Sequence, residues 1–221
     1  MANPRYSAQT SLAELATAHA GASRVFQRHG LDFCCQGQRS LAEACGERGL
    51  DPGSLLQELA EQRGTVLDRS APTDALIAHV VAHYHRRLRE ELPALVSMAL
   101  EVERVHASKA ACPRGLAAHL ERTWRELESH MAKEETVLFP LIASGHVRLD
   151  GPVRVMEAEH RDHALNLQQL RRLTSDFIAP QPACATWRAL YLRLSEFERE
   201  LMEHVHLENH VLFPRALGGA S

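Results

Sequence analysis

The sequence predicts an all-α protein, in which an up-down four-helix bundle follows a small helical domain. Aromatic residues make up only 5% of the 221 residues, whereas alanine, leucine, glutamate and arginine, which favour helices over strands, are abundant. Helix start and stop signals divide the chain into long segments with short connections, and such connections favour antiparallel neighbours. One segment that contains a histidine and a glutamate also occurs twice, as expected if helices are duplicated.

Residues 1–64 predict a compact domain of three helices, over 11–30, 40–49 and 51–64. The first two begin with the capping-box pattern Ser-Leu-Ala-Glu, and the third begins with Asp-Pro, an N-cap followed by a first-turn proline. Each ends at a glycine, the residue that most readily closes a helix. Residues 65–72 are expected to link this domain to the bundle.

The predicted bundle occupies residues 73–221. Apolar residues at helical spacing predict helices over 74–107, 113–142, 152–175 and 183–214. Pro93 lies inside the first of these helices and should bend it. The second and fourth run into Val-Leu-Phe-Pro, where we expect Pro140 and Pro214 to end or kink the helix.

The duplicated segment places an imidazole and a carboxylate on each of two helices. His130 and Glu134 have the same spacing as His204 and Glu208, and the offset is constant because 204 − 130 and 208 − 134 are both 74. Residues four apart lie on one face of an α-helix, about one turn apart. One His-x-x-x-Glu arises by chance on charged helices, but two in the same frame indicate a duplicated metal-binding helix.

The other two long helices should then supply matched ligands as well. His85 and His160 are 75 residues apart, one more than the offset of the first pair. We therefore interpret the chain as two helical hairpins that bring four imidazoles and two carboxylates together in the bundle core, where such sites form. The predicted metal ligands are His85, His130, Glu134, His160, His204 and Glu208.

The type and number of these ligands indicate which metal they bind. Six ligands exceed a tetrahedral zinc site, and calcium or magnesium would prefer oxygen ligands alone. Nitrogen mixed with carboxylate suits non-haem iron or manganese. We assign two iron ions, each with two histidines, bridged by Glu134 and Glu208. An oxo or hydroxo ligand is expected to join them; an oxo bridge lost on reduction from Fe³⁺ to Fe²⁺ would keep the core charge constant.

The remaining polar residues near these ligands leave alternatives open. Glu159 is either solvated or lines access to the metals, and His163 could approach the site from the same helix. Glu135 points about 100° away from Glu134 and should be solvated. His206 and His210 should face away from His204, because two residues correspond to about 200° around the helix.

Cysteine usage marks one further candidate site. Adjacent Cys34 and Cys35 cannot easily form a disulfide with each other, and their surroundings suggest an exposed turn. The pair is either a reactive or metal-handling thiol pair, or else a packed or incidental one. Cys45, Cys112 and Cys184 show no spacing that indicates a site, so we expect them to be structural. Five cysteines, an odd number, do not indicate a disulfide framework, and a reducing cytoplasmic location is expected.

Charge and hydropathy argue against two classes of partner. A net charge of −3 gives no electrostatic support for binding nucleic acid or an anionic membrane. No stretch approaches the roughly 20 apolar residues of a membrane span. The first residues lack the basic and apolar regions of a secretory signal.

The segment Asp32-Phe-Cys-Cys35 in a small helical domain, followed by a hemerythrin-like bundle with this ligand set, resembles the iron–sulfur cluster repair di-iron proteins over essentially the whole chain. The resemblance implies a cytoplasmic, stress-induced protein that restores clusters damaged by nitric oxide or peroxide, acting on damaged or apo iron–sulfur proteins. It implies the six metal ligands named above, a role for Cys34 and Cys35, and a place for Glu159 on the route to the metals.

The leading hypothesis is iron donation from a labile di-iron centre, with the cysteine-bearing domain docking or handing over. An oxygen carrier would have a second histidine four residues after His160, whereas residue 164 is alanine, which favours labile iron over oxygen carriage. The alternatives are a nitric oxide reductase that produces nitrous oxide and a sensor or carrier of O₂ or NO. A homodimer would stabilise the small domain, whose core is thin.

Overall fold

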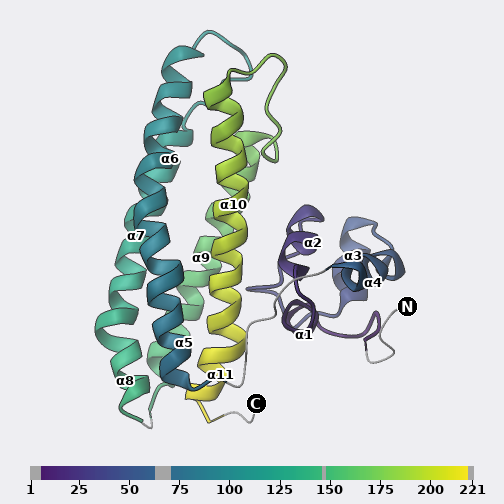
Figure 1. The fold of residues 1–221 in the computed structure, drawn as a ribbon, viewed down its shortest axis with the longest axis vertical. Helices are drawn as coiled ribbons and strands as arrows, with labels where there is room; N and C mark the ends of the chain where they lie inside the picture. Colours follow the sequence, from purple (N-terminus) through teal and green to yellow (C-terminus); the bar gives the residue numbers. More distant parts are fainter. Residues whose placement is uncertain (1–5, 63–70, 146–147, 219–221) are drawn as a thin grey trace. The chain divides into compact units, whose positions relative to one another are not determined.

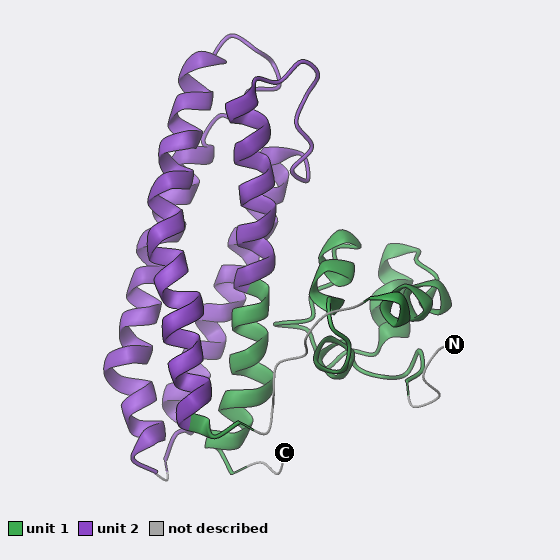
Figure 2. Cartoon of the chain, viewed as in Figure 1, with its two compact units in different colours: residues 1–73, 202–221 green, residues 74–201 purple. Residues whose placement is uncertain are grey.

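The structure, a computed structural model, describes residues 6–62, 71–145 and 148–218. Within these ranges the regular elements are helices, accompanied by an isolated β-bridge between Ser11 and Ser40. The chain is a hemerythrin-like four-helix bundle with a small N-terminal helical domain (Figure 1). By compactness it divides into one unit of Met1–Thr73 with Met202–Ser221 and a second unit of Asp74–Leu201 (Figure 2). We call these the cysteine unit and the bundle unit.

The bundle unit consists of long helices that lie side by side (Figure 1). Along the chain they are α5 (Thr73–His79) continuing through η1 (Val80–His85) into α6 (Arg86–Val105); α7 (Leu116–Lys133) continuing through η2 (Glu134–Leu138) into α8 (Phe139–Ala143); α9 (Asp150–Thr174); and α10 (Ala185–Leu207) up to Leu201. α7 packs along both α6 and α9. The core between them contains fully buried Leu92, Leu120, Leu127, Trp187 and Leu194. No helix in the described part of the chain is long and apolar enough to cross a membrane.

The helix bounds differ from the predicted ones mainly at prolines. α9 begins at Asp150, because Pro152 falls in the first turn, where a proline loses no helical hydrogen bond. α6 continues through Pro93. The chain also remains helical at Pro140 and Pro214, as the second residue of α8 and of α11 (Phe213–Ala216). In both places a π-helical turn, η2 (Glu134–Leu138) or η3 (Glu208–Leu212), comes just before the helix that contains the proline. The proline itself has no backbone N–H to donate.

In the cysteine unit, the first predicted helix is in fact two, α1 (Leu12–Ala18) and α2 (Ala22–Arg28). The break arises because His19 is extended and Gly21 adopts a left-handed conformation with φ of 75°. α3 (Leu41–Arg48) has the predicted capping box at Ser40, and α4 (Pro52–Glu61) has the predicted N-cap at Asp51. The predicted end of this last helix at Gly64, and residues 65–70 of the predicted linker, lie outside the described residues.

The segment from Phe33 to Gly37 is fixed within this unit by the C-terminal helix, through the end of α10 and η3 (Glu208–Leu212). The carbonyl oxygen of Cys34 accepts hydrogen bonds from Asn209 Nδ2 at 3.1 Å and from His210 Nε2 at 3.0 Å. His206 Nδ1 donates to the carbonyl oxygen of Phe33 at 3.3 Å. His206 and His210, which the sequence placed away from His204, therefore hold the cysteine segment.

Gly37 is where this segment comes closest to its neighbours. A Cβ atom at this position would lie 2.4 Å from the carbonyl oxygen of Phe33, 2.6 Å from His210 Nε2 and 2.8 Å from the Cβ of Ala13. The first of these is a backbone atom, which cannot rotate away. The absence of a side chain at Gly37 is therefore a condition for the docking of the cysteine segment.

We predict that Gly37→Ala lowers the free energy of unfolding by about 1–3 kcal/mol, the usual cost of overpacking. Gly46→Ala is the matched control, because a Cβ there, within α3, meets nothing within 4 Å and should be neutral or stabilising by up to about 1 kcal/mol. Denaturant midpoints of the full-length variants measure both effects. Equal effects of the two substitutions would contradict the close approach at Gly37.

Candidate metal centre

Four of the predicted ligands converge in the core of the bundle unit. His85, His130, Glu134 and His160 come from three different helices, and their side chains are at most 1% exposed. Glu134 Oε2 lies 3.3 Å from His85 Nε2 and 3.4 Å from His130 Nε2. His160 Nε2 lies 3.1 Å from His130 Nε2. These four predicted ligands are thus neighbours in space, although His85 and His160 are 75 positions apart in the sequence.

The other two predicted ligands lie in the cysteine unit. His204 Nε2 is 3.0 Å from Glu208 Oε1, and both side chains are buried. The prediction that a histidine and a glutamate four residues apart share one face is correct here, as it is for His130 and Glu134. This part of α10 therefore presents a buried imidazole next to a buried carboxylate.

π-Helical turns coincide with three of the six predicted ligands, and helical periodicity did not foresee them. His85 is the last residue of η1, Glu134 is the first of η2, and Glu208 is the first of η3. The carbonyl oxygens of Glu134 and Glu208 accept the wider i→i−5 bonds, from the N–H groups of Phe139 and Phe213. Such bulges are frequent at functional sites. The signal available in the sequence was the proline six residues after each glutamate.

Glu135 is not solvated as predicted but holds His85 in place. Its Oε1 accepts a hydrogen bond from His85 Nδ1 at 2.7 Å and one from Arg89 Nη1 at 2.9 Å. Arg89 is paired in turn with Glu128 at 3.1 Å. Although burial opposes ionisation, the hydrogen bonds from Arg89 and His85 keep the pKa of Glu135 below its usual value. The prediction failed because the angle along one helix does not reveal partners on the next.

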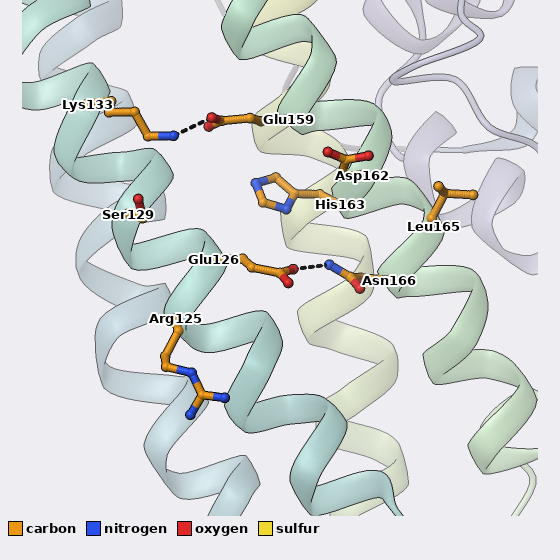
Figure 3. Close-up of a pocket in the computed structure, with 9 residues that line it drawn as sticks. All are labelled: Arg125, Glu126, Ser129, Lys133, Glu159, Asp162, His163, Leu165 and Asn166. Atoms are coloured by element: carbon orange, nitrogen blue, oxygen red, sulfur yellow. Dashed lines mark hydrogen bonds and ion pairs between the residues drawn. The ribbon is translucent and has the colours of Figure 1, made fainter.

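Glu159 has the corresponding position beside His130. Its Oε2 accepts a hydrogen bond from His130 Nδ1 at 2.9 Å, and its Oε1 pairs with Lys133. The ring of His163 stands perpendicular to that of His130, with 4.9 Å between centroids, so His163 does approach the site. Glu159 and His163 line a pocket of about 560 Å³ between α7 and α9, together with Lys133, Asp162 and Asn166 (Figure 3). The role of Glu159 in access to the metals stays a prediction.

The donor atoms fit a transition metal. His85 and His130 each direct Nδ1 at a carboxylate, which assigns the proton to Nδ1 and leaves the Nε2 lone pair facing Glu134. Imidazole nitrogen beside carboxylate oxygen is the ligand set of iron, manganese and related ions. In the bundle unit, the ligand atoms of His130, Glu134 and His160 lie within 4.8 Å of one another. The structure thus contains buried histidine and glutamate groups that can hold a metal ion.

The cysteine pair is less accessible than the sequence indicated. Cys34 is 3% exposed and Cys35 is half-buried. Their sulfurs are 3.7 Å apart, and Asp32 Oδ1 accepts hydrogen bonds from Cys34 Sγ at 3.2 Å and from the Cys35 N–H at 2.9 Å. The hydrogen bond with Cys35, burial, and the charge of Asp32 raise the pKa of Cys34 well above its usual value. The prediction that this segment is an exposed turn is wrong for Cys34, because Asn209 and His210 of η3 contact the segment.

Comparisons with known proteins agree with both parts of the chain. Residues 76–216 match the Hemerythrin HHE cation binding domain family, and residues 8–63 match a family described as a Domain of Unknown function (DUF542). An "Iron-sulfur cluster repair protein YtfE" of Edwardsiella ictaluri is 50% identical over 212 residues, which cover 94% of this chain and 96% of that protein. Proteins of the same name from Pectobacterium atrosepticum and Musicola paradisiaca are 46% and 47% identical, over 95% and 96% of this chain and 97% of each relative.

We predict that Glu135→Gln weakens metal binding about 10- to 100-fold, the usual effect of removing a carboxylate that orients a ligating histidine. Glu128→Gln is the matched control, because Glu128 pairs with Arg89, one step further from His85, and should change affinity far less. Competition with a chelator at fixed pH measures both. Unchanged affinity in Glu135→Gln would show that this carboxylate does not position His85.

Proposed function

This chain belongs to the family of iron–sulfur cluster repair proteins with a hemerythrin HHE cation binding domain, and we propose that it repairs damaged clusters by supplying iron from a labile di-iron centre. The observation that carries the proposal is the buried set of imidazoles and carboxylates, which belongs to a chain alike over nearly its whole length to proteins named for this repair. Damaged or apo iron–sulfur proteins are then its partners, and the cytoplasm is its proposed location.

The proposed centre has two metal positions that share their carboxylates. Each position would use two of the four predicted histidines, and Glu134 and Glu208 would belong to both, as bridging ligands do. When bound, two irons with an oxo or hydroxo bridge would supply ferrous iron and electrons to the damaged cluster. His85 and His130 would be held in orientation by Glu135 and Glu159.

Two features support release rather than permanent retention of one iron. Alanine at position 164 leaves the third helix without the extra histidine expected of an oxygen carrier. Glu159, which orients His130, lies in the wall of a pocket and pairs with a lysine whose side chain is 43% exposed. Glu135, which orients His85, is instead anchored by an arginine that also pairs with Glu128. We propose that the iron on the His130 side leaves first.

Cys34 and Cys35 are proposed to receive the iron during transfer. Asp32 Oδ1 and the two sulfurs lie within 4.8 Å of one another, a set of soft and carboxylate donors around one point. Because the pKa of Cys34 is raised, its thiol stays protonated near neutral pH, and a metal must displace that proton to bind. Such a site would bind iron weakly, as expected of a site that holds the metal only transiently during transfer.

A second candidate function is reduction of nitric oxide to nitrous oxide at the same centre. The pocket between α7 and α9 reaches His163, whose ring contacts that of His130, and its volume of about 560 Å³ admits diatomic ligands such as NO or O₂. Sensing or carriage of these molecules would use the same access. A homodimer stays a prediction.

We predict that Glu134→Gln with Glu208→Gln lowers bound iron from about two per chain to less than one, because both proposed positions lose their anionic ligands. Glu101→Gln is the matched control, since Glu101 pairs with Arg104 on the surface, and it should retain full iron. Metal analysis after anaerobic loading measures the content, and circular dichroism checks the fold. Full iron in the double variant would refute the bridging role.

We predict that the iron-loaded protein restores an apo iron–sulfur protein with stoichiometric loss of its own iron. Cys34→Ser with Cys35→Ser should keep the iron but slow transfer about tenfold or more, since hydroxyl oxygen is a poor substitute for thiolate with soft metals. Cys45→Ser, at another buried cysteine of the same unit, is the control. Many turnovers of nitrous oxide production without iron loss would instead support the reductase.

A further inference from the structure

Cys184 is paired with a histidine at a distance from the predicted metal ligands. Its sulfur lies 3.1 Å from His106 Nε2, and Cys184 is exposed whereas His106 is only 7% exposed. His106 directly follows α6, and Cys184 directly precedes α10, so the pair joins two connections of the bundle unit. These connections lie at the same end of the bundle (Figure 1). The sequence indicated a structural cysteine, but an exposed thiol adds nothing to a core.

Trp187 gives the pair a fixed geometry. Its indole ring is fully buried and packs on the imidazole of His106, with 4.9 Å between ring centroids. Its backbone N–H donates a hydrogen bond to Cys184 Sγ at 3.4 Å. A thiol, a nitrogen base within hydrogen-bond reach, and a third group that orients the base are the components of an activated nucleophile. The imidazole nitrogen and a backbone N–H of the first turn of α10 therefore both face the sulfur.

The residues around the pair are cationic. Lys109 Nζ donates to the carbonyl oxygen of Pro182 at 3.3 Å. The guanidinium of Arg188 donates to the carbonyl oxygen of Ala183. Arg114 Nη2 donates to the carbonyl oxygen of Lys109 at 3.2 Å. These three side chains are exposed, so they attract an anionic reagent to the thiol rather than neutralise a buried charge.

We propose that Cys184 is a modification site that forms a mixed disulfide with an anionic low-molecular-weight disulfide. His106 Nε2 takes the proton of the Cys184 thiol, and the thiolate attacks one sulfur of the reagent. A new bond forms between Cys184 and that sulfur while the sulfur–sulfur bond of the reagent breaks. The departing thiolate takes the proton back from His106. Cys184 is oxidised to the disulfide level and half of the reagent is reduced to a thiol, so atoms and electrons balance.

The site is independent of the proposed iron chemistry. His85 and His106 are 21 positions apart, because 106 − 85 is 21, on one continuous helical run, and therefore roughly 30 Å apart. A modification at Cys184 leaves the ligand groups untouched. A negative result for iron donation would therefore leave the proposal about Cys184 unaffected, and the reverse also holds.

The test uses the full-length, iron-loaded protein with oxidised glutathione as the probe, followed by peptide mass spectrometry to locate the adduct. We expect one adduct per chain, on Cys184, that forms about tenfold faster at neutral pH than on free N-acetylcysteine, since an ordinary thiol is only a few per cent ionised there. Cys184→Ser should lose the adduct. Cys112→Ser, a buried cysteine at the same end, is the matched control and should keep it.

The role of the histidine has its own readout. His106→Gln should slow the reaction about tenfold at neutral pH and make the rate rise with pH as for a free thiol, while bound iron stays unchanged. An adduct mainly on Cys34 or Cys35, or a Cys184 rate equal to that of N-acetylcysteine, would overturn the proposal. The comparison with N-acetylcysteine needs only the natural protein, so it decides the matter even if His106→Gln fails to fold.

Discussion

The burial of Glu134 and Glu208 is the constraint on which the rest of the structure depends. Neither side chain has any exposed surface, and the effective cost of burying an ionised carboxylate is several kcal/mol unless a counter-charge is present. The Nε2 atoms of His85 and His130 lie 3.3 and 3.4 Å from Glu134, and a metal cation held among these groups would offset that cost. Metal binding and the stability of this region are therefore coupled.

At the π-helical turns, neighbouring glutamates differ in burial and in the groups they contact. At the start of η2 the wider turn places Glu134 in the core and leaves Glu135 half-buried against His85 and Arg89. Glu159 has the same task for His130, but its cationic partner is a lysine beside a pocket. The two imidazoles are thus held by chemically alike contacts, one supported by an arginine that also pairs with Glu128 and the other by a lysine beside a pocket.

The C-terminal helix joins several chemical groups through its different faces. In the cysteine unit, His204 contacts Glu208, whereas Asn209 and His210 bind the carbonyl oxygen of Cys34. A shift of η3 would therefore be felt by a predicted ligand and by the thiol segment together. In the bundle unit, the same helix begins just after Cys184, which faces His106. One helix thus carries two of the predicted ligands and begins beside the contact between Cys184 and His106.

The pairing of His130 with Glu134 and of His204 with Glu208 could be predicted from sequence alone, because a histidine and a glutamate four residues apart share a helix face wherever that helix packs. Capping residues similarly placed the starts of α3 and α4, since a cap is a local contact. Only the tertiary structure decided that Cys34 is buried, that Glu135 binds His85 and that His106 faces Cys184. Each of these depends on residues distant in sequence, whose proximity comes from helix packing that no local pattern encodes.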